Sequence, residues 1–409
     1  MPGCLSIEGA FSRAVFPTSS EPQLAYLLLK LRSSGDPKGT RAPLNWSLVM
    51  DRSGSMRGEK IERLKAAVTL VIDRLSASDV LSVVLFNHET KTLISAGTVN
   101  DPDSLKKDVQ KIKTGGGTMI SVGMQAGIKE LEKTPSQGRV SRLLLLTDGQ
   151  TQGDDDICRD TAGRCSQANG PVIALGLGED WNEDLLQDIA RLSGGSWEWI
   201  TSADQIEAIF EREAKTLEDT MADNVKLTFR FPIGVTVRKV FRVVPLTEEI
   251  AFTAVGERDI EVRLGGLTRD IGQGVLAEVL IAPKLERGDY RVAKADLSAD
   301  FPVLNLYARQ ASLDMVAAFG PEPSGMNSEV TDYLDKIALV NLQSIATKRM
   351  KEGDAAGATK ALRNLATKAL ELGNEDLAST AATEADSLTK TGAMSSSGTK
   401  QLISKTRKL

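Results

Sequence analysis

The sequence has few aromatic residues, three cysteines, one histidine and no long apolar segment. Aromatic residues make up only 4% of its 409 residues, so the side chains on which single-stranded nucleic acids stack are scarce. Three cysteines, an odd number, match neither a disulfide framework nor a zinc-binding spacing. The single histidine, His88, makes a Ser-His-Asp catalytic set implausible. These absences argue against three common classes of function.

Charge and hydropathy limit the partners and the compartment. Lysine and arginine total 50 and aspartate and glutamate 55, which gives a net charge of -5 and argues against a general nucleic-acid or anionic-membrane binder. No apolar run approaches the roughly 18–20 residues that span a bilayer, so we expect no membrane insertion. The run at 24–31 contains Lys30 and follows no basic segment, unlike a signal peptide. We therefore expect a cytoplasmic protein.

A chain of this length predicts two or three domains at about 150 residues each. Between residues 43 and 221, apolar strands alternate with amphipathic helices. The segments 44–50 and 142–147 are continuous apolar strands, and 59–75 carries apolar residues at helical spacing. This alternation predicts an α/β domain, a doubly wound parallel sheet with helices on both faces.

The pattern of apolar residues changes after this domain. Apolar residues alternate at period two between 224 and 310, with glycine-rich turns between the runs, which predicts an antiparallel β-sandwich. The strand-like segments within residues 1–35 have no local partners, so we expect them to complete the same sandwich. The α/β domain would then be inserted between the two sandwich pieces.

The C-terminal part is rich in Ala, Leu, Lys and Glu. Residues 328–390 show helical spacing, and Gly353-Asp354 and Gly373-Asn374 each resemble a helix stop followed by a cap. We predict a bundle of three antiparallel helices. The remaining segment, 391–409, is a Ser/Thr-rich basic tail that we expect to be mobile, although phosphorylation at a site such as Thr399 is a less favoured alternative.

Hydroxyl and carboxylate side chains gather where strands of the α/β domain end. An Asp-x-Ser-x-Ser segment follows the strand at 44–50, a threonine follows the glycines at 115–117, and an aspartate follows the strand at 142–147. In an open parallel sheet, ligands bind outside the carboxyl ends of the strands. The five positions are Asp51, Ser53, Ser55, Thr118 and Asp148.

These five side chains supply three neutral oxygens and two carboxylates from three loops. Such a set suits Mg²⁺ or Mn²⁺, which prefer octahedral oxygen coordination and keep water where protein ligands are missing. For any one of these residues a helix cap or a turn is an adequate explanation. The ordered set of five favours a metal site, and we assign no catalytic residue and no organic cofactor.

The ordered motif resembles the metal-ion-dependent adhesion site (MIDAS) of von Willebrand factor type A domains, at all five positions. The resemblance covers residues 43–221. It implies that Ser53, Ser55 and Thr118 approach the metal through their hydroxyls, while Asp51 and Asp148 hold it directly or through water. It also implies that a partner protein fills the remaining position with an Asp or Glu carboxylate.

The flanking sandwich and C-terminal helices resemble those of prokaryotic regulatory members of this superfamily. Some of those regulators work with a forkhead-associated-domain partner and Ser/Thr protein kinases. The resemblance implies a metal-dependent adaptor for protein–protein interaction in a regulatory complex, without enzymatic activity.

Two alternatives remain open. A Mg²⁺-dependent phosphatase or hydrolase also places an aspartate after its first strand, but it needs an acid/base carboxylate two residues later, where this chain has Ser53. The second alternative is a structural scaffold that binds no metal. For Cys158 and Cys165 we expect buried thiols near one helix. For the three tryptophans Trp181, Trp197 and Trp199 we expect packing in the core or at a sheet edge in preference to a partner-facing patch.

Overall fold

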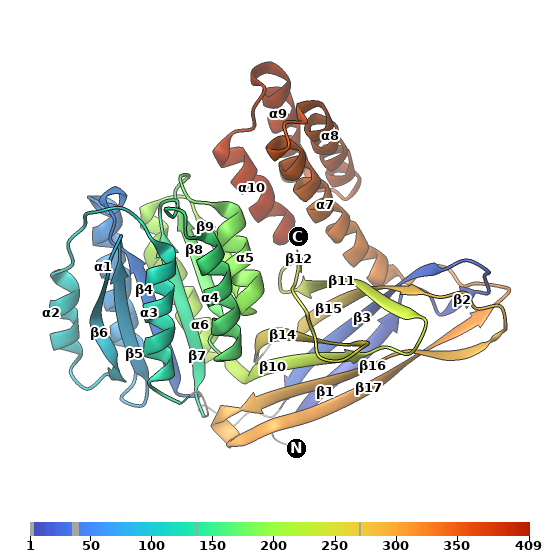
Figure 1. Ribbon diagram of the computed structural model, residues 1–409, viewed down its shortest axis with the longest axis horizontal. Helices are drawn as coiled ribbons and strands as arrows, with labels where there is room; N and C mark the ends of the chain where they lie inside the picture. The colour runs from blue at the N-terminus through green and yellow to red at the C-terminus, as the bar shows by residue number, and fades with distance from the viewer. Residues whose placement is uncertain (1–3, 35–40, 136–137, 270) are drawn as a thin grey trace.

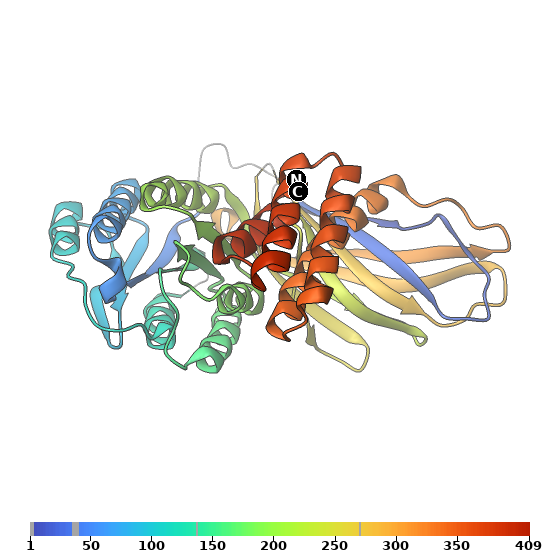
Figure 2. The same cartoon turned by 90° about the horizontal axis from the view of Figure 1, so that it is seen from above.

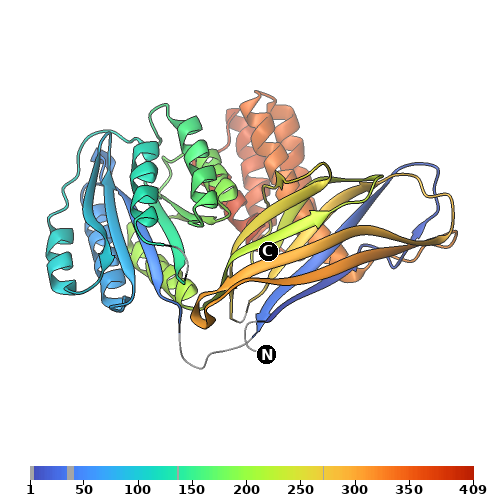
Figure 3. The ribbon, with the colours of Figure 1, turned by 60° about the horizontal axis from the view of Figure 1, so that its bottom comes forward.

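The computed structural model describes residues 4–34, 41–135, 138–269 and 271–409. Residues 1–3 and 35 of the predicted N-terminal unit lie outside this description. Figure 1 shows an α/β domain beside a β-sandwich, with a helical unit above their junction. Seen from above, the helices lie across the boundary between the other two units (Figure 2), and Figure 3 shows them behind that boundary.

The α/β domain has a six-stranded sheet in the order β6-β5-β4-β7-β8-β9. All neighbouring strands are parallel except β5 and β6, which are antiparallel. The predicted doubly wound parallel sheet is confirmed, with one antiparallel pair at this edge, because the short connection between β5 and β6 can only form a hairpin. The strands are β4 (Leu44–Asp51), β5 (Val80–Phe86), β6 (Thr90–Thr98), β7 (Val140–Thr147), β8 (Val172–Leu177) and β9 (Ser196–Ile200).

Helices cover both faces of this sheet. One face packs against α1 (Glu59–Arg74), α2 (Pro102–Gln110) and α6 (Ile206–Glu218), and the other against α3 (Ile120–Glu132), α4 (Asp155–Gln167) and α5 (Glu183–Ser193). Successive β4 side chains enter opposite cores, with Leu48 in the first and Val49 in the second. Burial on both faces explains why the central strands are mostly apolar.

Two sheets form the sandwich, in the orders β1-β3-β15-β11-β12 and β13-β14-β10-β16-β17-β2. As predicted, the N-terminal strands belong to it, since β3 pairs with β15. The strands begin at Thr220 and continue to Gly320, beyond the 224–310 range expected from alternation. The strands are β1 (Cys4–Phe11), β2 (Val15–Pro17), β3 (Gln23–Ser34), β10 (Thr220–Arg230), β11 (Val235–Val244), β12 (Glu248–Glu249), β13 (Thr253–Ala254), β14 (Asp259–Thr268), β15 (Gln273–Ile281), β16 (Gly288–Phe301) and β17 (Leu306–Gly320).

The C-terminal unit contains four helices instead of the three predicted. They are α7 (Ser328–Lys351), α8 (Ala355–Glu371), α9 (Glu375–Thr391) and α10 (Ser396–Arg407). Asn327, Asp354 and Asn374 cap the first three through their side chains. The predicted fold class, a doubly wound sheet inserted in a sandwich and followed by a helical bundle, is confirmed. Among the described residues, no helix combines the length and apolar character needed to cross a membrane.

The expectation of a mobile tail was wrong, because residues 396–407 form the packed helix α10. Its Lys400 ammonium lies 4.9 Å from the ring centre of Trp181, and its Arg407 guanidinium lies 4.4 Å from that of Trp197. Thr399 is only 9% exposed. The helix escaped prediction because Leu402 and Ile403 are its only buried apolar side chains, and cations over tryptophan rings leave no apolar periodicity.

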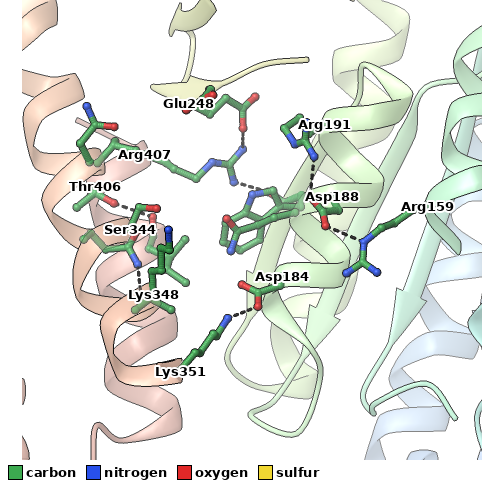
Figure 4. A pocket seen from close by; sticks show the side chains of 18 residues that line it. Arg159, Asp184, Asp188, Arg191, Glu248, Ser344, Lys348, Lys351, Thr406 and Arg407 are labelled. Carbon is green, nitrogen blue, oxygen red and sulfur yellow. Dashed lines mark hydrogen bonds and ion pairs between the residues drawn. The ribbon is translucent and has the colours of Figure 1, made fainter. Parts of the chain in front are cut away.

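All three units meet around Glu248 of β12, beside a cleft of about 550 Å³ (Figure 4). The Glu248 carboxylate accepts hydrogen bonds from Arg242 of the sandwich and Arg407 of α10. The Arg407 guanidinium also donates to the Trp197 carbonyl of the α/β domain at 2.9 Å. Lys351 of α7 pairs with Asp184 of α5 across the same cleft. Charged contacts therefore join the three units.

The expected cysteine and tryptophan burial is confirmed. Cys158 and Cys165 both lie on α4 and are buried, and burial raises the pKa of Cys165 to about 12. Trp181 and Trp197 are 1% and 4% exposed. These residues therefore contribute to the core of the α/β domain.

Gly176 of β8 provides a test of this core. A Cβ atom at Gly176 would lie 2.3 Å from two ring atoms of the buried Trp181. We expect Gly176→Ala to lower the free energy of unfolding by about 1–3 kcal/mol through overpacking. Gly163→Ala, in the middle of α4 with open space around it, should instead stabilise by about 0.5–1 kcal/mol. Urea unfolding followed by tryptophan fluorescence measures both, and equal effects would contradict the packing.

Candidate metal centre

Asp51 is the last residue of β4 and its carboxylate is fully buried. Its Oδ1 accepts a hydrogen bond from the Ser53 backbone N–H, and its Oδ2 accepts one from the Thr147 hydroxyl, both at 2.7 Å. Burial raises the pKa of this carboxyl above its usual range, although the hydrogen bonds from Thr147 and Ser53 oppose the shift. No ion pair of Asp51 occurs in the described part of the chain. The carboxylate is thus held by neutral donors alone.

A chain of hydroxyl contacts connects the turn after β4 to the end of β7. The Oγ atoms of Ser53 and Ser55 lie 3.0 Å apart, and the Ser55 hydroxyl donates to Asp148 Oδ1 at 2.7 Å. The 3₁₀ turn η1 (Gly54–Met56) begins directly after Ser53. The turn brings both serines to the same edge of the sheet as Asp148.

The glycine-rich loop before α3 rests on this turn. The Gly54 backbone N–H donates to the Gly116 carbonyl at 3.0 Å, and the Gly115 N–H donates to the Arg52 carbonyl at 2.8 Å. Gly116 has a φ of +83°, and a Cβ there would meet the His88 ring at 2.4 Å. Both restrictions favour glycine at this position.

Thr118 follows the glycines and lies beside the serine turn. Its Oγ1 is 3.6 Å, and the Ser55 Oγ 4.0 Å, from the point that a Cβ on Gly149 would occupy. The structure therefore brings all five predicted residues to one edge of the sheet, from the three loops that the sequence indicated. Asp148 and Ser53 are 1% and 2% exposed.

Lys60 is a residue of this site that the sequence analysis missed. Its Nζ lies 2.5 Å from Asp148 Oδ2. The Lys60 side chain is 33% exposed, whereas that of Asp148 is fully buried. A signal existed in the sequence, because a lysine in the first turn of a helix lies at the end where cations are disfavoured. Its partner lies 88 positions further along the chain, so spacing gave no indication of the pair.

Asp154 lies near the site but has a structural role. It is the N-cap residue of α4 and 3% exposed, and its carboxylate accepts hydrogen bonds from the Ser121 N–H and the Thr151 hydroxyl. The Thr151 hydroxyl also accepts from the Ile120 N–H at 3.0 Å. These bonds fix the start of α3, which begins two residues after Thr118.

The donor set determines which metal fits. The described residues contain no group of three or more His, Cys, Asp or Glu side chains that could hold an ion, so a zinc-like or acid-rich site has no support there. The gathered donors are oxygens, three hydroxyls and two carboxylates. Oxygen donors of this kind fit Mg²⁺ or Mn²⁺.

Comparison with known proteins agrees with this architecture. The family profile of the von Willebrand factor type A domain matches residues 47–212, and that of the Sll0103-like C-terminal alpha-helical domain matches residues 328–409. A von Willebrand factor type A protein from Catenulispora acidiphila has a similar structure, with a TM-score of 0.82, 17% identity and coverage of 98% of this chain and 96% of that one. The ArnB paralog VWA2 from Sulfolobus acidocaldarius gives a TM-score of 0.61 at 18% identity, with 98% of both chains covered.

At these identities the two structures show a shared fold alone. A closer relationship appears in sequence with the protein sll0103 of Synechocystis sp., which is 30% identical over 347 residues, or 83% of this chain and 82% of that protein. The match is longer than the type A region at 47–212, so it extends into the flanking units. The chain therefore belongs to the family of sll0103, in which a von Willebrand factor type A domain is combined with a Sll0103-like C-terminal helical domain.

Proposed function

We propose that this protein is a non-enzymatic adaptor whose type A domain captures an Asp or Glu carboxylate of a partner protein through a bound Mg²⁺ or Mn²⁺. The proposed metal ligands are the five residues of the motif, bound directly or through water. The observation that carries the proposal is the hydrogen-bonded series Ser53–Ser55–Asp148 beside Asp51 and Thr118, which gathers hard oxygen donors from three loops. The ligands are Asp51, Ser53, Ser55, Thr118 and Asp148.

The mixture of ligands supports carboxylate capture. Three of the five donors are neutral hydroxyls, so the protein contributes only two negative charges. A bound divalent cation would supply the positive charge that attracts one further carboxylate oxygen. The protein's part is to orient the hydroxyls, and the backbone bonds between the serine turn and the glycine loop do this.

We further propose a regulatory role in the cytoplasm, with a second partner surface on the units that flank the type A domain at 43–221. These are the sandwich pieces 1–35 and 224–310, the helices at 328–390 and the segment 391–409. A forkhead-associated-domain protein or a Ser/Thr kinase is the partner class that the resemblance to prokaryotic regulators suggests. Burial of Thr399 in the docked α10 argues against that residue as the phosphorylated contact, so this partnership rests on the metal site.

Affinity capture from the source cells tests the proposal. The tagged 409-residue chain should retain a partner in Mg²⁺ and lose it in EDTA, and Asp51→Ala should lose it in both buffers. Asp156→Ala is the matched control, because the Asp156 side chain is 97% exposed and pairs only with Arg159 within the described structure. Capture that persists in EDTA and in Asp51→Ala would contradict the mechanism and leave the scaffold alternative. Phosphate release from a generic phosphoester, lost in Asp51→Ala, would favour the phosphatase alternative instead.

A further inference from the structure

Lys60 and Ser55 both contact the carboxylate of Asp148. Its ammonium pairs with Oδ2 at 2.5 Å, while the Ser55 hydroxyl donates to Oδ1 at 2.7 Å. The Asp148 side chain is fully buried, and the Lys60 ammonium balances the negative charge of its carboxylate. A divalent cation held by Asp148 would lie close to the same ammonium.

The position of Lys60 on its helix is unfavourable without such a partner. It is the second residue of α1, where the helix dipole presents its positive end. The acidic neighbours Glu59 and Glu62 follow the usual preference for this turn, and Lys60 departs from it. The lysine is therefore placed by its contact with the site and not by the needs of the helix.

Charge balance suggests what this contact achieves. Asp51 and Asp148 together carry two negative charges, which a divalent cation alone would neutralise. A partner's carboxylate would then add an uncompensated negative charge beside buried groups, which is costly. With Lys60 the occupied site has one positive charge in excess, which matches a single incoming carboxylate.

We propose that Lys60 is the specificity-determining residue of this site, weakening the binding of the metal alone and providing the counter-charge for the partner's carboxylate. This inference rests on the proposed function. Lys60 suits the role because an ammonium on a flexible four-carbon stem reaches a nearby carboxylate without movement of α1. Metal and carboxylate should consequently bind cooperatively.

Mg²⁺ titration of the full chain by calorimetry tests this inference, with acetate as the carboxylate probe and chloride as the control salt. Lys60→Met should bind Mg²⁺ about tenfold more tightly than the wild type, because the repulsion between the two cations is gone. Acetate should tighten Mg²⁺ binding in the wild type, and this gain should shrink in Lys60→Met, since linkage between two ligands is reciprocal.

Three further variants complete the experiment. Lys60→Gln should behave like Lys60→Met, and Lys60→Arg, which keeps the charge, should behave like the wild type. Arg63→Met should change nothing, because Arg63 is on the same helix but pairs with Glu59 and Glu207, away from the site. Mg²⁺ binding that is unchanged or weaker in both neutral variants would overturn the role of Lys60 and leave the proposed function intact. Absence of Mg²⁺ binding in the wild type and in all variants would overturn the proposed function and this inference with it.

Discussion

Replacing Glu248 by alanine is expected to lower the free energy of unfolding by about 3–5 kcal/mol, because the change leaves two buried arginines without their shared partner. Arg242 and Arg407 each have side chains only 8% exposed, and Glu248 accepts a hydrogen bond from both. The Nε atoms of both arginines already lack a hydrogen-bond partner among the described residues. Burial lowers the pKa of Arg242. The Glu248 carboxylate opposes this shift, and the positive charge of Arg407 adds to it.

The neighbouring residue offers a matched control. Glu249 is on the same strand, but its side chain is 49% exposed and pairs with Lys239, so Glu249→Ala should cost less than about 1 kcal/mol. Urea unfolding followed by tryptophan fluorescence is suitable, because the Arg407 guanidinium lies against Trp197. If the junction is lost, the backbone amides of α10 should exchange their hydrogens faster in Glu248→Ala than in the wild type. Equal stability of the two variants would show that the junction contributes little to holding the units together.

Asp51→Asn should remove most of the stabilisation by Mg²⁺ without harming the fold in EDTA. An asparagine can still accept the hydrogen bond from the Ser53 N–H and can donate to the Thr147 hydroxyl. It also removes a fully buried charge, whose desolvation raises the pKa of Asp51. We therefore expect the variant in EDTA to be at least as stable as the wild type. Because loss of even an outer-shell group weakens metal affinity about 10–100-fold, loss of this carboxylate should cost about 100-fold or more.

Thermal unfolding with and without Mg²⁺ measures both halves of this prediction. A metal concentration 100 times the dissociation constant stabilises a protein by about 2.7 kcal/mol, so the wild type should show a clear rise in Tm. Asp51→Asn should gain no more than about 0.4 kcal/mol at the same concentration, whereas Asp156→Asn should rise like the wild type. A variant that loses stability equally in both buffers would indicate that Asp51 acts only as a structural residue.

Much of the fold was predictable because hydrophobic patterning follows directly from burial. Strands buried on both faces, such as β4 and β7, are mostly apolar, and the sandwich strands alternate. Hydrophobic patterning did not predict an element whose buried contacts include charged side chains. It also did not predict the direction of a strand that is set by the length of the loop before it. The helix α10 contributes only Leu402 and Ile403 as buried apolar side chains and relies on cations over tryptophan rings. The direction of β6 depended on the short loop before it.

The candidate site was predictable to the extent that its residues form an ordered motif. Asp51, Ser53 and Ser55 are close in sequence, and Thr118 and Asp148 each follow a recognisable glycine or strand signal. Lys60 has only the weak signal of a cation in the first turn of a helix, and its role depends on a carboxylate at the end of a different strand. A lone lysine on an amphipathic helix is usually a solvated surface residue. Only the three-dimensional arrangement identifies its partner.

The most direct test of the metal site is anomalous X-ray scattering from crystals of this 409-residue chain grown with Mn²⁺. Mn²⁺ takes the same octahedral oxygen coordination as Mg²⁺ and can be located by its scattering. We expect one anomalous peak at the carboxyl ends of β4 and β7 and no such peak in Asp51→Asn. The peak should lie within bonding or water-bridged distance of Ser53, Ser55, Thr118, Asp51 and Asp148. A peak elsewhere, or none at this edge with saturating Mn²⁺, would contradict this prediction.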